Sequence, residues 1–144
     1  DRELVKLYLC LVWGRLPQKS ATLTAYLEKL PDENRVIVSD RKTPANRTIR
    51  TKYRVLREFT DRSLVEVDLL TGRTHQIRAH FALLGDGKYG SNKDNKQVGM
   101  DCQALYSYKL RFEFTTPAGC LEYLNGREFT VKDPGKIWFM DRAE

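Results

Sequence analysis

Several segments of this chain alternate apolar with polar side chains, and a period of two residues is that of a β-strand whose two faces lie in different surroundings. Lys6–Trp13 follows the pattern and stops at Gly14. Ile49–Phe59 and Ser63–Leu70 flank the turn Thr60-Asp61-Arg62, which predicts a hairpin. The expected strands are Lys6–Trp13, Arg35–Val38, Ile49–Phe59, Ser63–Leu70, Ala104–Phe114, Leu121–Leu124, Glu128–Val131 and Ile137–Met140.

Two segments have helical spacing instead. The first is Ser20–Leu30, with Ser20 as N-cap and Pro31 as stop, and the second is Thr74–Leu84, with Gly85 as a left-handed stop. Asn125-Gly126 predicts a type I′ turn that pairs the strands on either side of it. These elements predict one domain of the α+β class, with a mixed, largely antiparallel sheet and flanking helices.

The composition indicates the cellular compartment in which the protein works. The chain has 144 residues, of which 41% are apolar, and no apolar run is long enough to cross a bilayer. Its cysteines are odd in number, widely spaced and without a CxxC pair; they are Cys10, Cys102 and Cys120. Reduced thiols in the cytoplasm are therefore expected.

The positive charge is concentrated in one segment. Eight basic and two acidic residues lie between Arg41 and Arg62, a local excess equal to the net charge of +6 of the whole chain. In the strand expected there, Arg50, Lys52 and Arg54 fall two residues apart and share one face. Such a segment is typical of proteins that bind a phosphate backbone, although a solvated strand and loop has the same composition.

The most informative run is Leu69–His80, which reads as a strand end, a tight turn and the start of a helix. Arg73 and Arg78 add two permanent charges near a helix N-terminus, where anions are favoured. On such a helix His75 and Arg78 share a face, and an arginine there is suited to bidentate pairing with a carboxylate that it keeps ionised. The side chains expected to face the core are Ile77, Phe81 and Leu84.

The same run, Thr-Gly-Arg-Thr-His-Gln-Ile-Arg-Ala-His, resembles the signature of RNA pseudouridine synthases of the RluA family. Other parts agree in order, and the resemblance covers nearly the whole chain. The segments that carry it are Lys6–Gly14, Tyr53–Leu56, Ser63–Val67, Gly85–Gly90 and Gln103–Tyr106. By this resemblance residues 1–144 are the C-terminal part of the family's catalytic domain.

The resemblance implies isomerisation of selected uridines to pseudouridine in ribosomal or transfer RNA, without metal or cofactor and away from membranes. Tyr8 matches the tyrosine that stacks on uracil and is proposed to take part in proton transfer, and Arg78 matches the arginine that pairs with the nucleophilic aspartate. A core aromatic and a helix surface charge are the alternative interpretations of these two. The residues expected to bind RNA are Arg50, Lys52, Arg54, Arg73, Thr74, His75, Gln76 and Lys88.

The chain departs from the family pattern at the nucleophile, which the family carries in a segment resembling His-Arg-Leu-Asp. Four aspartates precede an arginine, but none follows His-Arg-Leu; they are Asp1, Asp40, Asp61 and Asp141. We therefore expect a fragment that makes no pseudouridine by itself. A second departure is the direct junction of Gly85 and Asp86, at the start of the polar loop expected over Asp86–Val98, where the family has a longer stretch.

Two other functions stay open. A non-catalytic RNA-binding module would fit the missing aspartate, and the upstream gene sequence would discriminate it. A scaffold would fit a basic segment that meets an acidic protein, and salt-dependent RNA binding would speak against it. His75 and His80 are five residues apart and do not match a metal-binding HxxxH pair. Missing upstream strands would also leave an unpaired sheet edge, through which self-association is expected.

Overall fold

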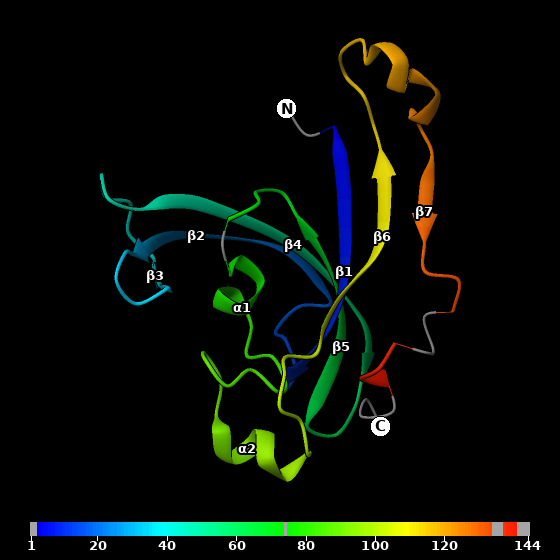
Figure 1. Cartoon of the computed structure of the whole chain (residues 1–144). Helices are drawn as coiled ribbons and strands as arrows, with labels where there is room; N and C mark the ends of the chain where they lie inside the picture. The colour runs from blue at the N-terminus through cyan, green and yellow to red at the C-terminus, as the bar shows by residue number, and fades with distance from the viewer. Residues whose placement is uncertain (1–2, 74, 134–136, 141–144) are drawn as a thin grey trace.

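A computed structural model describes residues 3–73, 75–133 and 137–140 of the chain (Figure 1). Its strands form one seven-stranded sheet in the order β3-β2-β4-β5-β1-β6-β7, and every described pair of neighbours is antiparallel. The strands are β1 (Leu4–Trp13), β2 (Ser20–Leu30), β3 (Arg35–Ser39), β4 (Arg47–Glu58), β5 (Arg62–Leu69), β6 (Leu105–Phe112) and β7 (Glu128–Thr130). With short helices packed beside it, this sheet confirms the α+β prediction.

Strand β1 lies near the middle of the sheet because it is apolar on both faces. Leu9 and Leu11 pack into a cluster on one face, and Cys10 and Val12 pack into a second cluster on the other. Its neighbours are β5 on one side and β6 on the other. The strand expected at Lys6–Trp13 is thus confirmed, and its side chains contribute to the hydrophobic clusters on both faces of the sheet.

The predicted hairpin is also confirmed as β4 and β5, whose register pairs Tyr53 with Val67. Along β4, alternate side chains are buried, among them Thr51 and Tyr53. The side chains between them are exposed on the opposite face, as expected; they are Arg50, Lys52 and Arg54.

The helix expected at Ser20–Leu30 is wrong, because this segment is strand β2 and pairs with both β3 and β4. Its apolar residues fit helical spacing, but they also fit a period of two. The more buried positions alternate with exposed Ser20, Thr22 and Thr24, whose small or β-branched side chains suit a strand. The inward positions are Ala21, Leu23, Ala25 and Leu27.

The helix expected at Thr74–Leu84 is shorter than predicted. Helix α1 covers Gln76–His80, and Phe81 is already extended. The chain then pairs with the last part of β1, which β6 leaves free: Leu83 forms a bridge with Val12, and the Trp13 amide donates to the Ala82 carbonyl at 2.9 Å. Backbone pairing beside β1 therefore ends the helix four residues early, although Gly85 has the expected positive φ of 76°. The three side chains expected in the core, Ile77, Phe81 and Leu84, are buried.

Three expectations for the C-terminal half are wrong. The loop expected over Asp86–Val98 contains helix α2 (Asn92–Gln97), whose N-cap Ser91 accepts a hydrogen bond from the Asp94 amide. The strand expected at Leu121–Leu124 is a 3₁₀-helix, η1 (Gly119–Leu124). The segment Ile137–Met140 forms a turn rather than a strand, and it buries Ile137 and Phe139 in the core.

The hairpin expected around Asn125-Gly126 has a different partner. Asn125 has φ −57° and ψ 128° and Gly126 has φ 76°, which are angles of a type II turn. A type I′ turn needs a positive φ at both positions, which Asn125 lacks, and residues 121–124 before the turn belong to η1, so they offer no strand for pairing. Instead β7 pairs with β6, and the two strands extend upward with η1 at their tip (Figure 1).

The edges of the sheet are the short strands β3 and β7. Short edge strands limit pairing with another chain, and self-association through them stays a prediction. No helix among the described residues is long and apolar enough to cross a membrane.

Candidate functional site

The signature run forms a tight loop and helix that one buried amide ties to β4. Gln76 is 2% exposed. Its Nε2 donates to the Arg50 carbonyl and to Thr51 Oγ1, both at 2.9 Å. Its Oε1 accepts from the Arg73 amide at 3.1 Å and from Thr71 Oγ1 at 2.8 Å. All four hydrogen-bonding positions of this side chain are used inside the protein, so Gln76 shapes the loop, and direct contact with RNA stays a prediction that its burial does not favour.

His75 and Arg78 share a face of this segment, as predicted, and both meet Tyr89. His75 has a left-handed backbone (φ 55°), and a hydrogen bond of 2.9 Å joins its Nδ1 to Tyr89 Oη. The same Oη accepts from the Val36 amide at 3.0 Å, which leaves the hydroxyl proton for the imidazole. Burial, together with the nearby charges of Arg78 and Lys88, lowers the pKa of His75 and favours its neutral form.

Arg78 is held by Asp86, a residue that sequence reasoning did not single out. Nε donates to Oδ2 at 2.9 Å and Nη2 donates to Oδ1 at 2.8 Å, which is a side-on bidentate pair. Asp86 is 1% exposed. Burial by itself would raise the pKa of Asp86, but the hydrogen bonds from Arg78 and from the backbone amides of Tyr89 and Lys88 outweigh it and lower the pKa overall. The hydrogen bond to Asp86 raises the pKa of Arg78, so both partners are charged.

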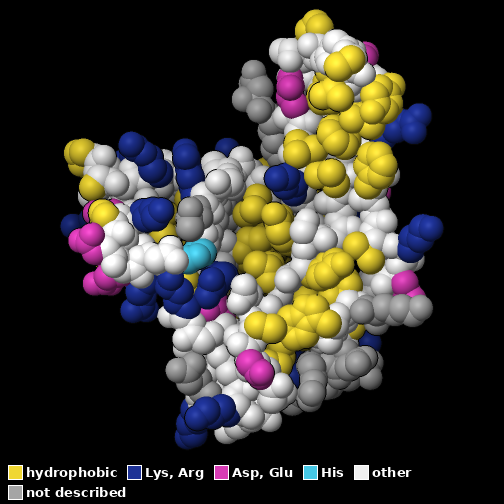
Figure 2. Space-filling model, in the orientation of Figure 1, with side chains coloured by type: hydrophobic (Ala, Val, Ile, Leu, Met, Phe, Trp, Pro, Cys, Tyr) yellow, Lys and Arg dark blue, Asp and Glu magenta, His cyan; other side chains and the backbone are white. Residues whose placement is uncertain are grey.

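Tyr8 lies in a groove beside the loop of the signature run, residues 69–73, which is called the signature loop below. Tyr8 is half-buried on β1 and lines an open hollow of about 660 Å³ with Lys6 from the same strand and with Arg73. The other residues along this groove are Glu3, Leu4, Leu69, Leu70, Thr71 and Gly72. From the side drawn in Figure 2, hydrophobic side chains lie at the bottom of a hollow, with Lys and Arg side chains gathered to its left. An aromatic ring with two cations beside it suits a flat base and its phosphate.

Tyr8 and Arg78 lie on the same side of the sheet but in different hollows. Tyr8 packs against the cluster that contains Ile77, the neighbour of Arg78. Arg78 lines a separate hollow with His80 and Tyr89, where its guanidinium carbon is 5.2 Å from the centre of the Tyr89 ring. The signature helix and the tyrosine strand therefore share a face, as the resemblance implies, without direct convergence of the two side chains.

The basic strand faces the other way. Tyr8 is paired with Val67 and Val67 with Tyr53, so these three side chains share the face that α1 covers. Lys52 and Arg54 alternate with Tyr53 and project from the opposite face.

On that opposite face the bases are matched by acids of β5. Arg54 forms an ion pair of 3.1 Å with Glu66, and Lys52 is paired in register with Asp68. The basic side chains predicted on this strand, Arg50, Lys52 and Arg54, are therefore exposed, but they do not line the groove of Tyr8.

The remaining candidates divide in the same way. Arg73 is exposed in the Tyr8 groove, whereas Thr74 lies outside the described residues. Lys88 does not line the Tyr8 groove. Its ammonium group donates a hydrogen bond to the Asn34 carbonyl in the β2–β3 turn. Sequence reasoning missed Asp86, Tyr89 and Lys6, although the first two lie in a segment, Gly85–Gly90, that carried part of the resemblance. The described residues hold no group of three His, Cys, Asp or Glu side chains that could bind a metal.

Comparison with known proteins agrees with the motif. The sequence profile of the RNA pseudouridylate synthase family matches residues 1–83. An RNA pseudouridine synthase of Chloroflexus aurantiacus is 41% identical over 100 residues, which are 65% of this chain and 30% of that protein. The ribosomal large subunit pseudouridine synthase D of Nitrosomonas europaea is 36% identical over 128 residues, which are 81% of this chain and 35% of that protein. The chain thus spans about a third of the length of these curated relatives.

The fold is also found in a solved structure. Human RNA pseudouridylate synthase domain containing 1 superposes with a TM-score of 0.71 over 92% of this chain and 56% of that one, at 23% identity. The profile match covers more than half of the chain, and it includes β1 and the whole signature run Leu69–His80. By this match the chain belongs to the RNA pseudouridylate synthase family, as its resemblance to the RluA-type members indicated.

Proposed function

We propose that this chain is the part of an RNA pseudouridine synthase that receives the target uridine, and that the complete gene product converts uridine to pseudouridine in RNA. The observation that carries the proposal is the groove between β1 and the signature loop, where the Tyr8 ring and the Arg73 side chain lie together. A uridine that has left its stack needs an aromatic surface for the base and a cation for the phosphate beside it.

The roles of the residues follow from their places. Tyr8 stacks on the uracil, and Lys6 and Arg73 contact phosphates at the two sides of the groove. Arg78 pairs with the nucleophilic carboxylate, a role taken from the family. Arg50, Lys52 and Arg54 contact RNA on the opposite sheet face and add affinity rather than chemistry. We place the reaction in the cytoplasm, which the three free cysteines support.

Ribosomal RNA is the substrate class that we favour over transfer RNA. The support is a relative whose name refers to the large ribosomal subunit. This preference concerns the whole protein, since the chain matches about a third of that relative.

The experiment uses the complete gene product and total RNA from cells that lack the gene. Ribosomal and transfer RNA are separated after the reaction, digested to nucleosides, and analysed for pseudouridine by chromatography. We expect new pseudouridine in the ribosomal fraction, and a loss of at least about 100-fold in rate for Arg78→Gln, which removes a charge needed at the nucleophile. Lys93→Gln, an exposed charge on α2, serves as the matched control and should react like the wild type.

Three outcomes would decide against parts of the proposal. RNA that binds without any conversion would favour a non-catalytic RNA-binding module. Conversion confined to the transfer RNA fraction would contradict the preferred substrate. Pseudouridine formed by the 144-residue chain alone would contradict the expectation that it lacks its own nucleophile.

A further inference from the structure

We propose that Asp86 is a positioning residue for Arg78, which holds the guanidinium group at a fixed angle so that its free edge can pair with a second carboxylate. The inference rests on the proposed function, because the second carboxylate is the nucleophile of that reaction. Asp86 acts through Arg78 and does not itself touch the base.

The geometry of the pair leaves the necessary edge free. Asp86 uses the side-on edge of the guanidinium, which consists of Nε–H and one N–H of Nη2. An arginine has five N–H donors in one plane, so Nη1 and the outer hydrogen of Nη2 remain for an end-on partner. A single guanidinium can thus pair with two carboxylates at once, one for its position and one for its chemistry.

Asp86 is itself fixed by the backbone that follows it. Its Oδ1 accepts from the Lys88 amide at 3.0 Å and from the Tyr89 amide at 3.1 Å, besides Arg78. With three donors on one oxygen and a side chain that is 1% exposed, the carboxylate has one available orientation.

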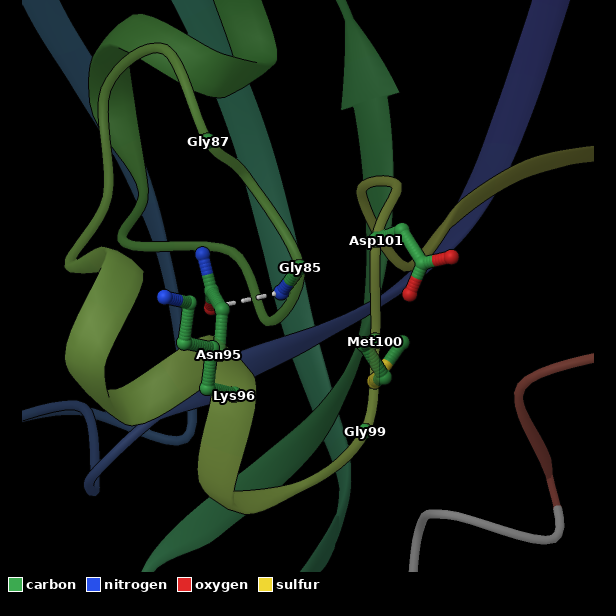
Figure 3. Close-up of a pocket in the computed structure, with 7 residues that line it drawn as sticks. All are labelled: Gly85, Gly87, Asn95, Lys96, Gly99, Met100 and Asp101. Carbon is green, nitrogen blue, oxygen red and sulfur yellow. Dashed lines mark hydrogen bonds between the residues drawn. The ribbon is translucent and has the colours of Figure 1, made fainter.

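The glycines before and after Asp86, Gly85 and Gly90, lie where the backbone leaves no space for a side chain. A Cβ at Gly85 would lie 1.9 Å from the Cys102 carbonyl oxygen, and one at Gly90 would lie 2.5 Å from the Asp86 carbonyl oxygen. Helix α2 adds a further restraint, because the Gly85 amide donates to Asn95 Oδ1 at 2.8 Å, and Asn95 is 4% exposed. Figure 3 shows the side-chain amide of Asn95, which extends from α2 toward the backbone nitrogen of Gly85. Both residues line a hollow of about 430 Å³.

A second contact restrains the Arg78 guanidinium, this time from the ring of Tyr89. Tyr89 lies over it at 5.2 Å, and Tyr89 is in turn fixed by its hydrogen bonds to the Val36 amide and to His75. The pair with Asp86 therefore sets the angle of the guanidinium, and the contact with the Tyr89 ring adds a second restraint on its position.

The test measures pseudouridine formation by the complete gene product as kcat and KM for RNA. Asp86→Asn keeps the shape of the side chain and removes its charge. We expect kcat to fall about 100-fold with KM changed by less than about threefold, because a misplaced guanidinium impairs the reacting geometry and leaves RNA binding intact. Asp101→Asn, an exposed aspartate, is the matched control with wild-type kinetics expected.

A double-mutant cycle separates positioning from mere stability. In the Arg78→Gln background the Asp86→Asn change should cost nothing further in kcat, since the group that it positions is gone. Equal, multiplicative losses in both backgrounds would overturn the inference. If Asp86→Asn does not fold, judged by thermal unfolding, Asp86→Glu replaces it; this variant keeps the charge but displaces the carboxylate, and an unchanged kcat would overturn the inference. An inactive wild type would refute the proposed function and the inference with it, whereas an active wild type with an unaffected Asp86→Asn refutes the inference alone.

Discussion

The two faces of the central sheet use polar residues in opposite ways. On the face that α1 covers, polar groups are buried and bonded to one another, as the four hydrogen bonds of Gln76 and the bidentate pair of Arg78 and Asp86 illustrate. On the other face, Lys52 and Arg54 are exposed and lie beside acids of the next strand. Fixed geometry on one face suits chemistry, and exposed charge on the other suits attraction of a polyanion.

The largest effect on stability is expected at Gly85, whose backbone supports Asp86 on the face that α1 covers. Gly85→Ala places a methyl group 1.9 Å from the Cys102 carbonyl oxygen at a residue with φ 76°. The backbone must shift, so we expect a loss of roughly 3 kcal/mol or more in the free energy of unfolding of the 144-residue chain, measured with urea. Gly72→Ala is the control, because nothing lies within 4 Å of its Cβ position, and its change should stay within about 0.5 kcal/mol. Equal stability of the two variants would break the contrast.

The next effect concerns the buried amide. Gln76→Leu has a similar size but takes away the acceptor of the Arg73 amide and the hydrogen bonds that the Gln76 side chain makes with the Arg50 carbonyl and with the hydroxyls of Thr51 and Thr71. We expect about 2 kcal/mol of destabilisation by urea unfolding. Lys52→Leu on the opposite face should change stability by less than about 0.5 kcal/mol. A harmless Gln76→Leu would mean that the loop does not depend on this side chain.

The next prediction concerns the opposite face and the dependence of RNA affinity on salt concentration. Replacing both Lys52 and Arg54 by alanine removes two exposed charges, so the slope of log affinity for RNA against log salt should become shallower by about 1.4 if both contact phosphates of single-stranded RNA. Binding of the complete gene product to RNA between low and moderate salt measures this slope. Lys93→Ala on α2 should leave it unchanged. A double variant with the wild-type slope would remove this face from the RNA-binding surface.

The smallest effect is on the dependence of stability on pH. Burial lowers the pKa of His80, and burial with Arg78 and Lys88 lowers the pKa of His75, relative to the ordinary value of 6.5. The unfolded chain then binds protons first as the pH falls. Stability should be complete above about pH 6.5 and should decline as the pH falls below it, until the folded-state pKa values are passed.

Urea unfolding at several pH values from 8 to 5 measures this decline. His80→Gln should make it shallower, because His75 and His80 are the two histidines of the chain. An equal slope in this variant would show that the pKa of His80 is not lowered by folding.

The sequence could not predict whether Tyr8 and the basic residues of β4 lie on the same face of the sheet. Alternation placed Arg50, Lys52 and Arg54 on one side of β4 correctly. Whether that side also carries Tyr8 depends on the register of β1 against β5, and no short turn joins these two strands. A slip of one residue would reverse the answer, so only the pairing of Tyr8 with Val67 decides it.

Other successes and failures have similarly local causes. The β4–β5 hairpin was predictable because its turn and both strands are adjacent in the chain. Strand β2 was not, since its apolar residues satisfy two periods and only its pairing with β3 and β4 selects one. The left-handed backbone at Gly85 was predicted, but the pairing of Asp86 with Arg78 and the support of Gly85 by α2 are contacts between separate segments that no motif encodes. The signature run could be assigned to a loop and helix because its turn and helix residues are adjacent in the chain, whereas the hydrogen bonds of Gln76 to Arg50 and Thr51 that tie it to β4 could not be predicted.

The central claim is that the uridine meets the face of Tyr8 and the signature loop. It is tested most directly by single-turnover conversion of RNA by the complete gene product at saturating enzyme, comparing Tyr8→Leu with the double change Lys52→Ala and Arg54→Ala. We predict a rate constant lowered about 100-fold or more for Tyr8→Leu, because stacking and proton transfer are lost, and a rate within about twofold of wild type for the double variant. A Tyr8→Leu enzyme that converts RNA at the wild-type rate, beside a double variant that is inactive at saturation, would contradict it.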